Sequence, residues 1–179
     1  MRAHLAGWLA DHRPADEREA ESLNATRRLL AVPDAFSSSL FDPGHVTASA
    51  FVVHPDEDSV ALLLHSKIGA WLQPGGHVEP DDVSIVAAAL REVREEIGVG
   101  ALDEPWLCDV DVHVFPSREE IPRHLHHDVR VAFRADSPDL VVGDGADDVR
   151  WFPFTEAVEL DESVARPVRK LVEWRRVHN

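Results

Sequence analysis

The sequence from Gly75 to Val99, GGHVEPDDVSIVAAALREVREEIGV, joins a glycine pair to a strongly helical segment. Apolar residues recur in it at intervals of four, three and four, as Val86, Leu90, Val93 and Ile97. This spacing predicts a helix over 83–97 with one apolar stripe that faces a core. Gly98 is expected to end the helix in a left-handed conformation, and the side chain of Asp82 or Ser84 can cap its start.

The polar side of this helix carries three acidic residues, Glu92, Glu95 and Glu96. Two charges ~6 Å apart repel by roughly 3 kcal/mol at an effective dielectric near 20. The cluster is either a solvated face on which Arg91 bridges to Glu95, four residues on, or a set of oxygen ligands for Mg²⁺. The glycine pair favours the metal site, because residues without side chains let the backbone approach an ion or phosphate closely.

The stretch resembles the signature of the Nudix hydrolases, which reads glycine, five residues, glutamate, seven residues, then Arg-Glu-apolar-x-Glu-Glu-x-Gly-apolar. The second half agrees at every position from Arg91 to Val99. The first half departs from the pattern, since the turn between Gly76 and Arg91 is one residue longer and Asp81 or Asp82 replaces the glutamate. We interpret this as a tolerated variant that leaves the role of the first acid open.

The resemblance implies a metal shell for Mg²⁺ or Mn²⁺ made of Glu92, Glu96, Glu95 and the carbonyl of Gly75 or Gly76. It also implies catalytic roles for Glu92 and for Glu95, which would bind metal or activate the water, while Arg91 would orient a glutamate. The implied reaction is attack of water on phosphorus, which hydrolyses the diphosphate linkage of a nucleoside diphosphate-X substrate.

Further polar residues are candidates for contacts with substrate. His124, His126 and Asp128 are spaced at i, i+2 and i+4, so they share one face if the segment is extended. They are interpreted either as a further metal or phosphate contact or as a polar loop that runs into an edge strand. His77, inside the signature loop, either contacts a phosphate or is simply a polar loop residue. The substrate candidates are therefore His77, His126 and Asp128.

Two aromatic residues and one acidic turn allow two interpretations each. Trp71 and Phe115 belong to the core or stack on a base. The turn that contains Asp144, Asp147 and Asp148 is solvated or supplies a further acid to the site, as in some Nudix relatives.

The flanking sequence indicates a mixed α/β protein. Residues 1–32 predict two helical segments separated at Pro14, and a Pro, Gly and Ser-rich loop follows to Gly44. Strand-like runs occupy 46–53, 59–66, 106–115, 128–133 and 149–153, and an amphipathic helix closes the chain over 163–178. With the resemblance, this order implies a Nudix-type α/β/α sandwich with a mixed β-sheet: an N-terminal helical arm and linker over 1–42, then a Nudix domain over 43–179.

Charge and composition limit the partners. Acidic residues outnumber basic ones by 33 to 18, for a net charge of -15, so binding to nucleic acid is not expected. No run approaches the about 18 apolar residues that a membrane helix requires, and the N-terminus lacks the pattern of a secretory signal. The only cysteine, Cys108, is expected to be buried and reduced, which favours the cytoplasm.

The sequence indicates the family more clearly than the substrate. The chain has no tyrosine, so the tyrosine that marks dinucleoside polyphosphate hydrolases is absent. Pro116, by contrast, lies close to the position at which ADP-ribose-type relatives carry a proline.

The alternatives to an enzyme are a catalytically silent Nudix-fold sensor of nucleotide ligands and a structural acidic domain.

The N-terminal arm is too short to fold alone. We expect Trp8 to anchor it, either on its own domain or, as the favoured hypothesis, in a homodimer.

Overall fold

The computed structural model describes residues 1–118 and 120–178. The helices are α1 (Arg2–Asp11), α2 (Glu17–Leu29), α3 (Ile85–Ile97), α4 (Phe154–Ala157) and α5 (Glu162–His178). The strands are β1 (His45–Val53), β2 (Ser59–His65), β3 (Trp71–Leu72), β4 (Gly75–His77), β5 (Trp106–Phe115), β6 (His124–Arg134) and β7 (Ala146–Pro153). Within these described ranges, no helix combines the length and apolarity needed to cross a membrane.

The strands form one mixed sheet in the order β3-β2-β1-β6-β5, with β4 also paired to β1 and β7 to β2. β1 and β6 run parallel, from His45 opposite His126 to Val53 opposite Arg134, while the other pairs are antiparallel. The predicted mixed sheet is therefore confirmed. The interpretation of 124–127 as a polar loop before an edge strand is wrong, because this segment is the start of β6. All four residues pair with β5, and residues 126 and 127 pair with β1 as well.

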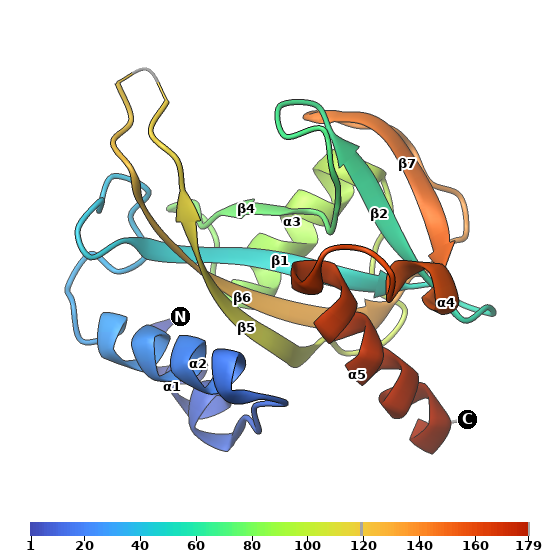
Figure 1. Ribbon diagram of the computed structural model, residues 1–179, viewed down its shortest axis with the longest axis horizontal. Helices are drawn as coiled ribbons and strands as arrows, with labels where there is room; N and C mark the ends of the chain where they lie inside the picture. Colours follow the sequence, from blue (N-terminus) through green and yellow to red (C-terminus); the bar gives the residue numbers. More distant parts are fainter. Residues whose placement is uncertain (119, 179) are drawn as a thin grey trace.

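Helices cover both faces of this sheet, which makes the α/β/α sandwich that was expected (Figure 1). Side chains alternate along β1, so Val46 and Ala48 pack into the core beneath α3, while Phe51 and Val53 pack into a second core beneath α5. On the α5 side, the first half of β1 presents polar residues instead: His45, Thr47 and Ser49. Because an apolar helix does not cover this half, the sheet can form the floor of a polar cleft there.

The helix α3 begins and ends as its capping residues require. The side chain of Ser84 accepts a hydrogen bond from the backbone N–H of Ala87, and Gly98 ends the helix with φ 76°. The buried face is rotated from the predicted stripe, since Ile85, Ala88, Ala89, Val93 and Ile97 are buried while Val86 and Leu90 are only half-buried. The small alanine side chains let the helix lie close to the sheet on that side.

The N-terminal arm packs against its own chain. Its leucines Leu5, Leu9 and Leu23 are buried in the same core as Val46, and α2 lies along β5. Trp8 is only half-buried at the edge of this core. The two predicted helices are confirmed, and the cis packing explains how a segment with one apolar stripe per helix is stabilised.

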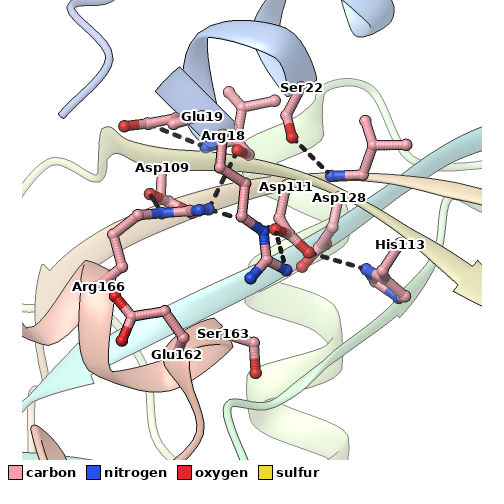
Figure 2. Close-up of polar contacts among 12 residues, drawn as sticks. Arg18, Glu19, Ser22, Asp109, Asp111, His113, Asp128, Glu162, Ser163 and Arg166 are labelled. Carbon is pink, nitrogen blue, oxygen red and sulfur yellow. Dashed lines mark hydrogen bonds and ion pairs between the residues drawn. The ribbon is translucent and has the colours of Figure 1, made fainter. Parts of the chain in front are cut away.

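A buried ion network joins the arm, the sheet and the last helix (Figure 2). Asp109 on β5 pairs with Arg166 on α5 at 2.8 Å and with Lys170 at 2.8 Å. Glu19 on α2, whose side chain is fully buried, pairs with the same Lys170. Burying such charges is tolerated because each is paired and hydrogen-bonded. Cys108, next to this network, is buried and free, as predicted.

Candidate active site

The glycine pair of β4 lies in direct contact with the acidic face of α3. The backbone N–H of Gly75 donates a hydrogen bond of 2.9 Å to the carboxylate of Glu96. A Cβ atom at Gly76 would lie 2.5 Å from Oε1 of Glu92, and one at Gly75 would overlap the side chain of Ser49. At Gly75 a side chain is therefore excluded by the neighbouring strand β1, whereas at Gly76 it would displace the carboxylate of Glu92.

Arg91 holds two of the glutamates in place. Its guanidinium donates to Glu92 at 2.8 Å and to Glu95 at 3.2 Å, and also to the carbonyl of His77 at 2.9 Å. Asp82 accepts from Arg91 at 3.0 Å and is the main cause that raises the pKa of Arg91. The acid in the lengthened turn thus binds the arginine of the signature rather than joining the glutamate cluster, whereas Asp81 is exposed.

The glutamates lie in an environment that disfavours their charge. Burial is the main cause that raises the pKa of Glu96 to about 7; the negative charges of Glu92 and Glu95 also contribute, and the hydrogen bond from Gly75 opposes them. Burial likewise raises the pKa of Glu92, although Arg91 opposes this. Several carboxylate oxygens held together with insufficient positive charge are the donor set that a hard divalent cation requires, so these residues fit Mg²⁺ or Mn²⁺.

A cleft of about 240 Å³ lies beside β4. Its polar wall includes Thr47, Ser49, Gln73, His113 and the three substrate candidates His77, His126 and Asp128. Among the described residues that line it, none is lysine or arginine. The structure therefore brings all three candidates to one cleft, together with Gly75 and Gly76 at its edge.

The carboxylate of Asp128 is fixed by internal hydrogen bonds. Thr47 donates to it at 3.1 Å, Ser49 at 2.8 Å and Arg130 at 2.8 Å. Arg130 in turn pairs with Asp109 and Asp111 of the buried ion network. Asp128 therefore connects the floor of the cleft to the charges beneath it.

The structure separates the two aromatic candidates. Trp71 lies against the second core, where its ring meets Phe152 with centroids 4.8 Å apart. Phe115 lines the cleft, and its ring stacks on His126 with centroids 5.0 Å apart. Of the two, only Phe115 is placed where it can contact a ligand of this cleft.

The acidic turn after β6 contacts the end of α3. The backbone N–H of Gly143 donates to the carbonyl of Glu96 at 2.9 Å, and that of Asp144 donates to the carbonyl of Glu95 at 3.3 Å. The carboxylate of Asp148 pairs with Arg150 at 2.5 Å. This turn therefore supports the backbone of the helix that carries the glutamates.

A buried histidine that the sequence does not mark as a candidate, His45, lies against His77 and His126 of the cleft, with ring centroids 5.0 Å and 4.9 Å away. Nitrogen atoms of His45, His77 and His126 all lie within 4.8 Å of one another. His45 begins β1, where the parallel register sets it opposite His126. The sequence contains no signal for this pairing, because the register between two strands so distant in the chain depends on the folded sheet.

These histidines are uncharged at neutral pH. The pKa of His45 is lowered to about 4 and that of His126 to about 3, mainly by burial and in part by the neighbouring histidine rings. The pKa of His77 is lowered as well, mainly by burial. Their nitrogen lone pairs are therefore available as acceptors or ligands.

Comparison with solved structures shows the same fold. The Nudix domain of NrtR from Shewanella oneidensis, solved with ADP-ribose, has 20% sequence identity and a TM-score of 0.56, over 82% of this chain and 96% of that one. The MutT protein of Bacillus halodurans has 21% identity and a TM-score of 0.54, over 70% and 78%. The Ap4A hydrolase of C. elegans, in a binary complex, has 16% identity and a TM-score of 0.54, over 73% and 97%.

A sequence model described as the NUDIX domain matches residues 43–174, which is most of the chain. The match includes the glycine pair, Arg91 and the three glutamates of α3. The chain belongs to the family of Nudix hydrolases.

Proposed function

We propose that this protein hydrolyses the diphosphate linkage of a nucleoside diphosphate-X substrate, with Mg²⁺ or Mn²⁺ bound at the glutamate cluster. The observation that carries the proposal is the contact of Glu92 and Glu96 with β4 at Gly76 and Gly75, beside a cleft, with Glu95 joined to Glu92 through Arg91. Burial raises the pKa of Glu96 to about 7, and a divalent cation would supply the missing positive charge.

Each residue of the cluster would contribute in its own way. Glu92 and Glu96 are half-buried carboxylates and would hold the ion, with a carbonyl of Gly75 or Gly76 completing its shell. Glu95 has a side chain that is 52% exposed, so it can reach a water molecule and accept its proton. Arg91 is a positioning residue, since it binds Glu92 and Glu95. The ion, when bound, would neutralise charge on phosphoryl oxygens and make water more acidic.

The cleft supports a phosphate-containing substrate. His77 and His126 offer neutral imidazoles along its wall, and Asp128 offers a fixed carboxylate. Phe115 gives the same wall an aromatic ring for a nucleoside. The solved relatives are described with ADP-ribose, as an Ap4A hydrolase or as a dihydroneopterin triphosphate pyrophosphohydrolase, which supports the class of phosphoanhydrides rather than one compound.

A panel assay tests this function. Purified protein is incubated with nucleoside triphosphates, nucleotide sugars, ADP-ribose and dinucleoside polyphosphates, with and without Mg²⁺ or Mn²⁺, and released phosphates are separated by chromatography. The expected result is cleavage of at least one compound at its diphosphate linkage, abolished by chelation. If some compound binds and none is cleaved with either metal, the protein is instead a ligand sensor. If none binds or is cleaved, the enzymatic proposal is wrong.

We also propose that the protein acts in the cytoplasm as a homodimer, with the arm of residues 1–42 supporting the Nudix domain of 43–179. The buried reduced Cys108 is compatible with a reducing compartment. Trp8 remains half-exposed beside Trp106 in a groove of about 590 Å³, which gives the arm an aromatic surface for a second copy. Light scattering is expected to give twice the 19.9 kDa chain mass, and Trp8→Ala to shift it toward one chain. A monomeric unmodified protein would contradict the dimer.

A further inference from the structure

Three histidines from three strands converge on the side of β4 that faces away from the glutamates. Within the strand β4, a Cβ at Gly76 would point at Glu92, so the next side chain, that of His77, points to the opposite face. His45 of β1 and His126 of β6 meet it there, with nitrogen atoms all within 4.8 Å. The cluster is therefore separate from the carboxylate site, although both adjoin the same short strand.

The burial and hydrogen bonding of the His45 side chain are those typical of a metal ligand. Its residue surface is 0% exposed, and its Nδ1–H donates to the carbonyl of Leu40 at 3.0 Å. The other ring nitrogen, Nε2, therefore carries a lone pair, and among the described residues it has no hydrogen-bond partner. Metal-binding histidines commonly donate their second ring N–H to a backbone carbonyl, whereas a buried polar atom without a partner is otherwise unfavourable.

His126 is also oriented by hydrogen bonds, which reach it through His124. His124 donates its Nδ1–H to the carbonyl of Pro122 at 2.8 Å, which leaves a lone pair on Nε2. That Nε2 lies 3.0 Å from Nε2 of His126, so His126 donates there and keeps its lone pair on Nδ1. The lowered pKa values of His45 and His126 leave both rings neutral, as ligands must be.

We propose that His45, His77 and His126 bind a divalent transition-metal ion of the zinc class, with His124 as a positioning residue. Imidazole nitrogen favours Zn²⁺, Co²⁺ or Ni²⁺, whereas Mg²⁺ prefers the oxygen atoms of the glutamates. Metal–nitrogen bonds of about 2.0–2.1 Å require the rings to approach one another by about 1–2 Å when the ion binds. Because His77 and His126 line the cleft, a fourth coordination position faces it and is open to water or to an anionic oxygen.

Cobalt provides a test that does not depend on activity. Protein freed of metal is titrated with Co²⁺, and the visible d–d absorption reports nitrogen coordination; Zn²⁺ is then added as a competitor. The titration uses a Glu92→Gln/Glu96→Gln background, which removes the carboxylate site. One Co²⁺ per chain is expected, displaced by Zn²⁺.

The histidine variants decide whether the cluster is the site. His77→Ala and His126→Ala, each in that background, should weaken Co²⁺ binding by more than about tenfold and remove the absorption band. The matched control is His4→Ala, because His4 is exposed on α1 and should leave the titration unchanged. Circular dichroism establishes which variants are folded, and either folded variant suffices.

Two results would overturn the proposal. One is that no Co²⁺ binds to the background protein, and the other is that folded His77→Ala or His126→Ala binds Co²⁺ with the same affinity as the background protein. The first would mean that the histidines serve as a neutral polar cluster only. Neither result bears on Mg²⁺-dependent hydrolysis, which is measured on the unmodified glutamates.

Discussion

The ammonium group of Lys170 lies 2.5 Å from the carboxylate of Glu19, although 151 positions separate the two residues. Lys170 also donates to Asp109 at 2.8 Å, so one cation on α5 binds both the arm and the central sheet. His12 completes the surroundings of Glu19 at 2.6 Å, from the end of α1. The arm is therefore attached through charges as well as through its leucines.

Removal of this cation should destabilise the whole protein. Lys170→Met leaves two buried carboxylates, Glu19 and Asp109, without their shared partner, and breaking such a buried pair costs about 3–5 kcal/mol. Urea unfolding followed by circular dichroism measures the change. The matched control is Arg169→Met on the same helix, whose ion pair with Glu162 is about half exposed and should be worth less than about 1 kcal/mol. Equal losses in the two variants would contradict the assigned role of Lys170.

Stability should depend on pH through Glu19. Burial alone would raise its pKa, but hydrogen bonds from His12 and Lys170 outweigh burial and lower it to about 2, from 4.5. The folded state therefore keeps the charge at pH values where the unfolded chain binds a proton. The resulting stability is complete above about pH 4.5 and is lost as pH falls toward about 2.

Comparison with Glu19→Gln isolates this contribution, since glutamine does not titrate. The difference in unfolding free energy between the parent and this variant, measured in urea from pH 7 downward, should be constant above about pH 5 and shrink steadily below it. A difference that stays constant down to pH 3 would show that Glu19 has an ordinary pKa.

Gly76→Ala should impair catalysis with little effect on stability. The new Cβ would lie 2.5 Å from Oε1 of Glu92 and force that carboxylate aside, whereas the extended backbone of β4 accepts alanine. A displacement of this size lowers the turnover number by about a hundredfold. The control is Gly7→Ala in α1, where nothing lies within 4 Å, so activity is kept and stability rises by about 0.5–1 kcal/mol. Unchanged turnover in Gly76→Ala would disprove the contact.

Glu96→Gln should separate activity from stability. Turnover is expected to fall by more than about a hundredfold, because outer-shell partners of a metal alone account for about 10- to 100-fold. The melting temperature without metal should stay equal or rise, since burial and neighbouring negative charges disfavour the carboxylate of Glu96. Activity within about threefold of the parent at saturating Mg²⁺ would remove Glu96 from the metal site. Glu173→Gln, exposed on α5, is the control.

Rules that depend only on neighbouring residues were sufficient to predict the helix α3 and the position of its glutamates on one face. Ser84 and Gly98 are read from capping preferences, which depend on a few neighbouring residues. Glu92 and Glu96 share a face because four residues make about one helical turn. The offset of the buried stripe toward Ala88 could not be predicted, since it depends on how closely the sheet approaches.

The features of the site and the fold that the sequence did not predict depend on contacts between segments distant in the chain. The register between β1 and β6 brings His45 to His126, and neither strand specifies it alone. The sequence identifies Asp82 as a candidate acid, but its pairing with Arg91 depends on the path of the lengthened turn. The burial of Glu19 follows from Lys170, at the far end of the chain.

The described residues of the cleft wall include no lysine or arginine, and this has a consequence for the rate of substrate binding. A phosphorylated compound that diffuses toward the cleft meets a protein of net charge -15 and, among the described lining residues, no fixed cation. Ions of the buffer shorten the range of this repulsion to about 8–10 Å at ordinary ionic strength. Inert monovalent salt should therefore raise kcat/KM for a highly charged substrate, the reverse of its effect on enzymes that attract phosphates through basic clefts.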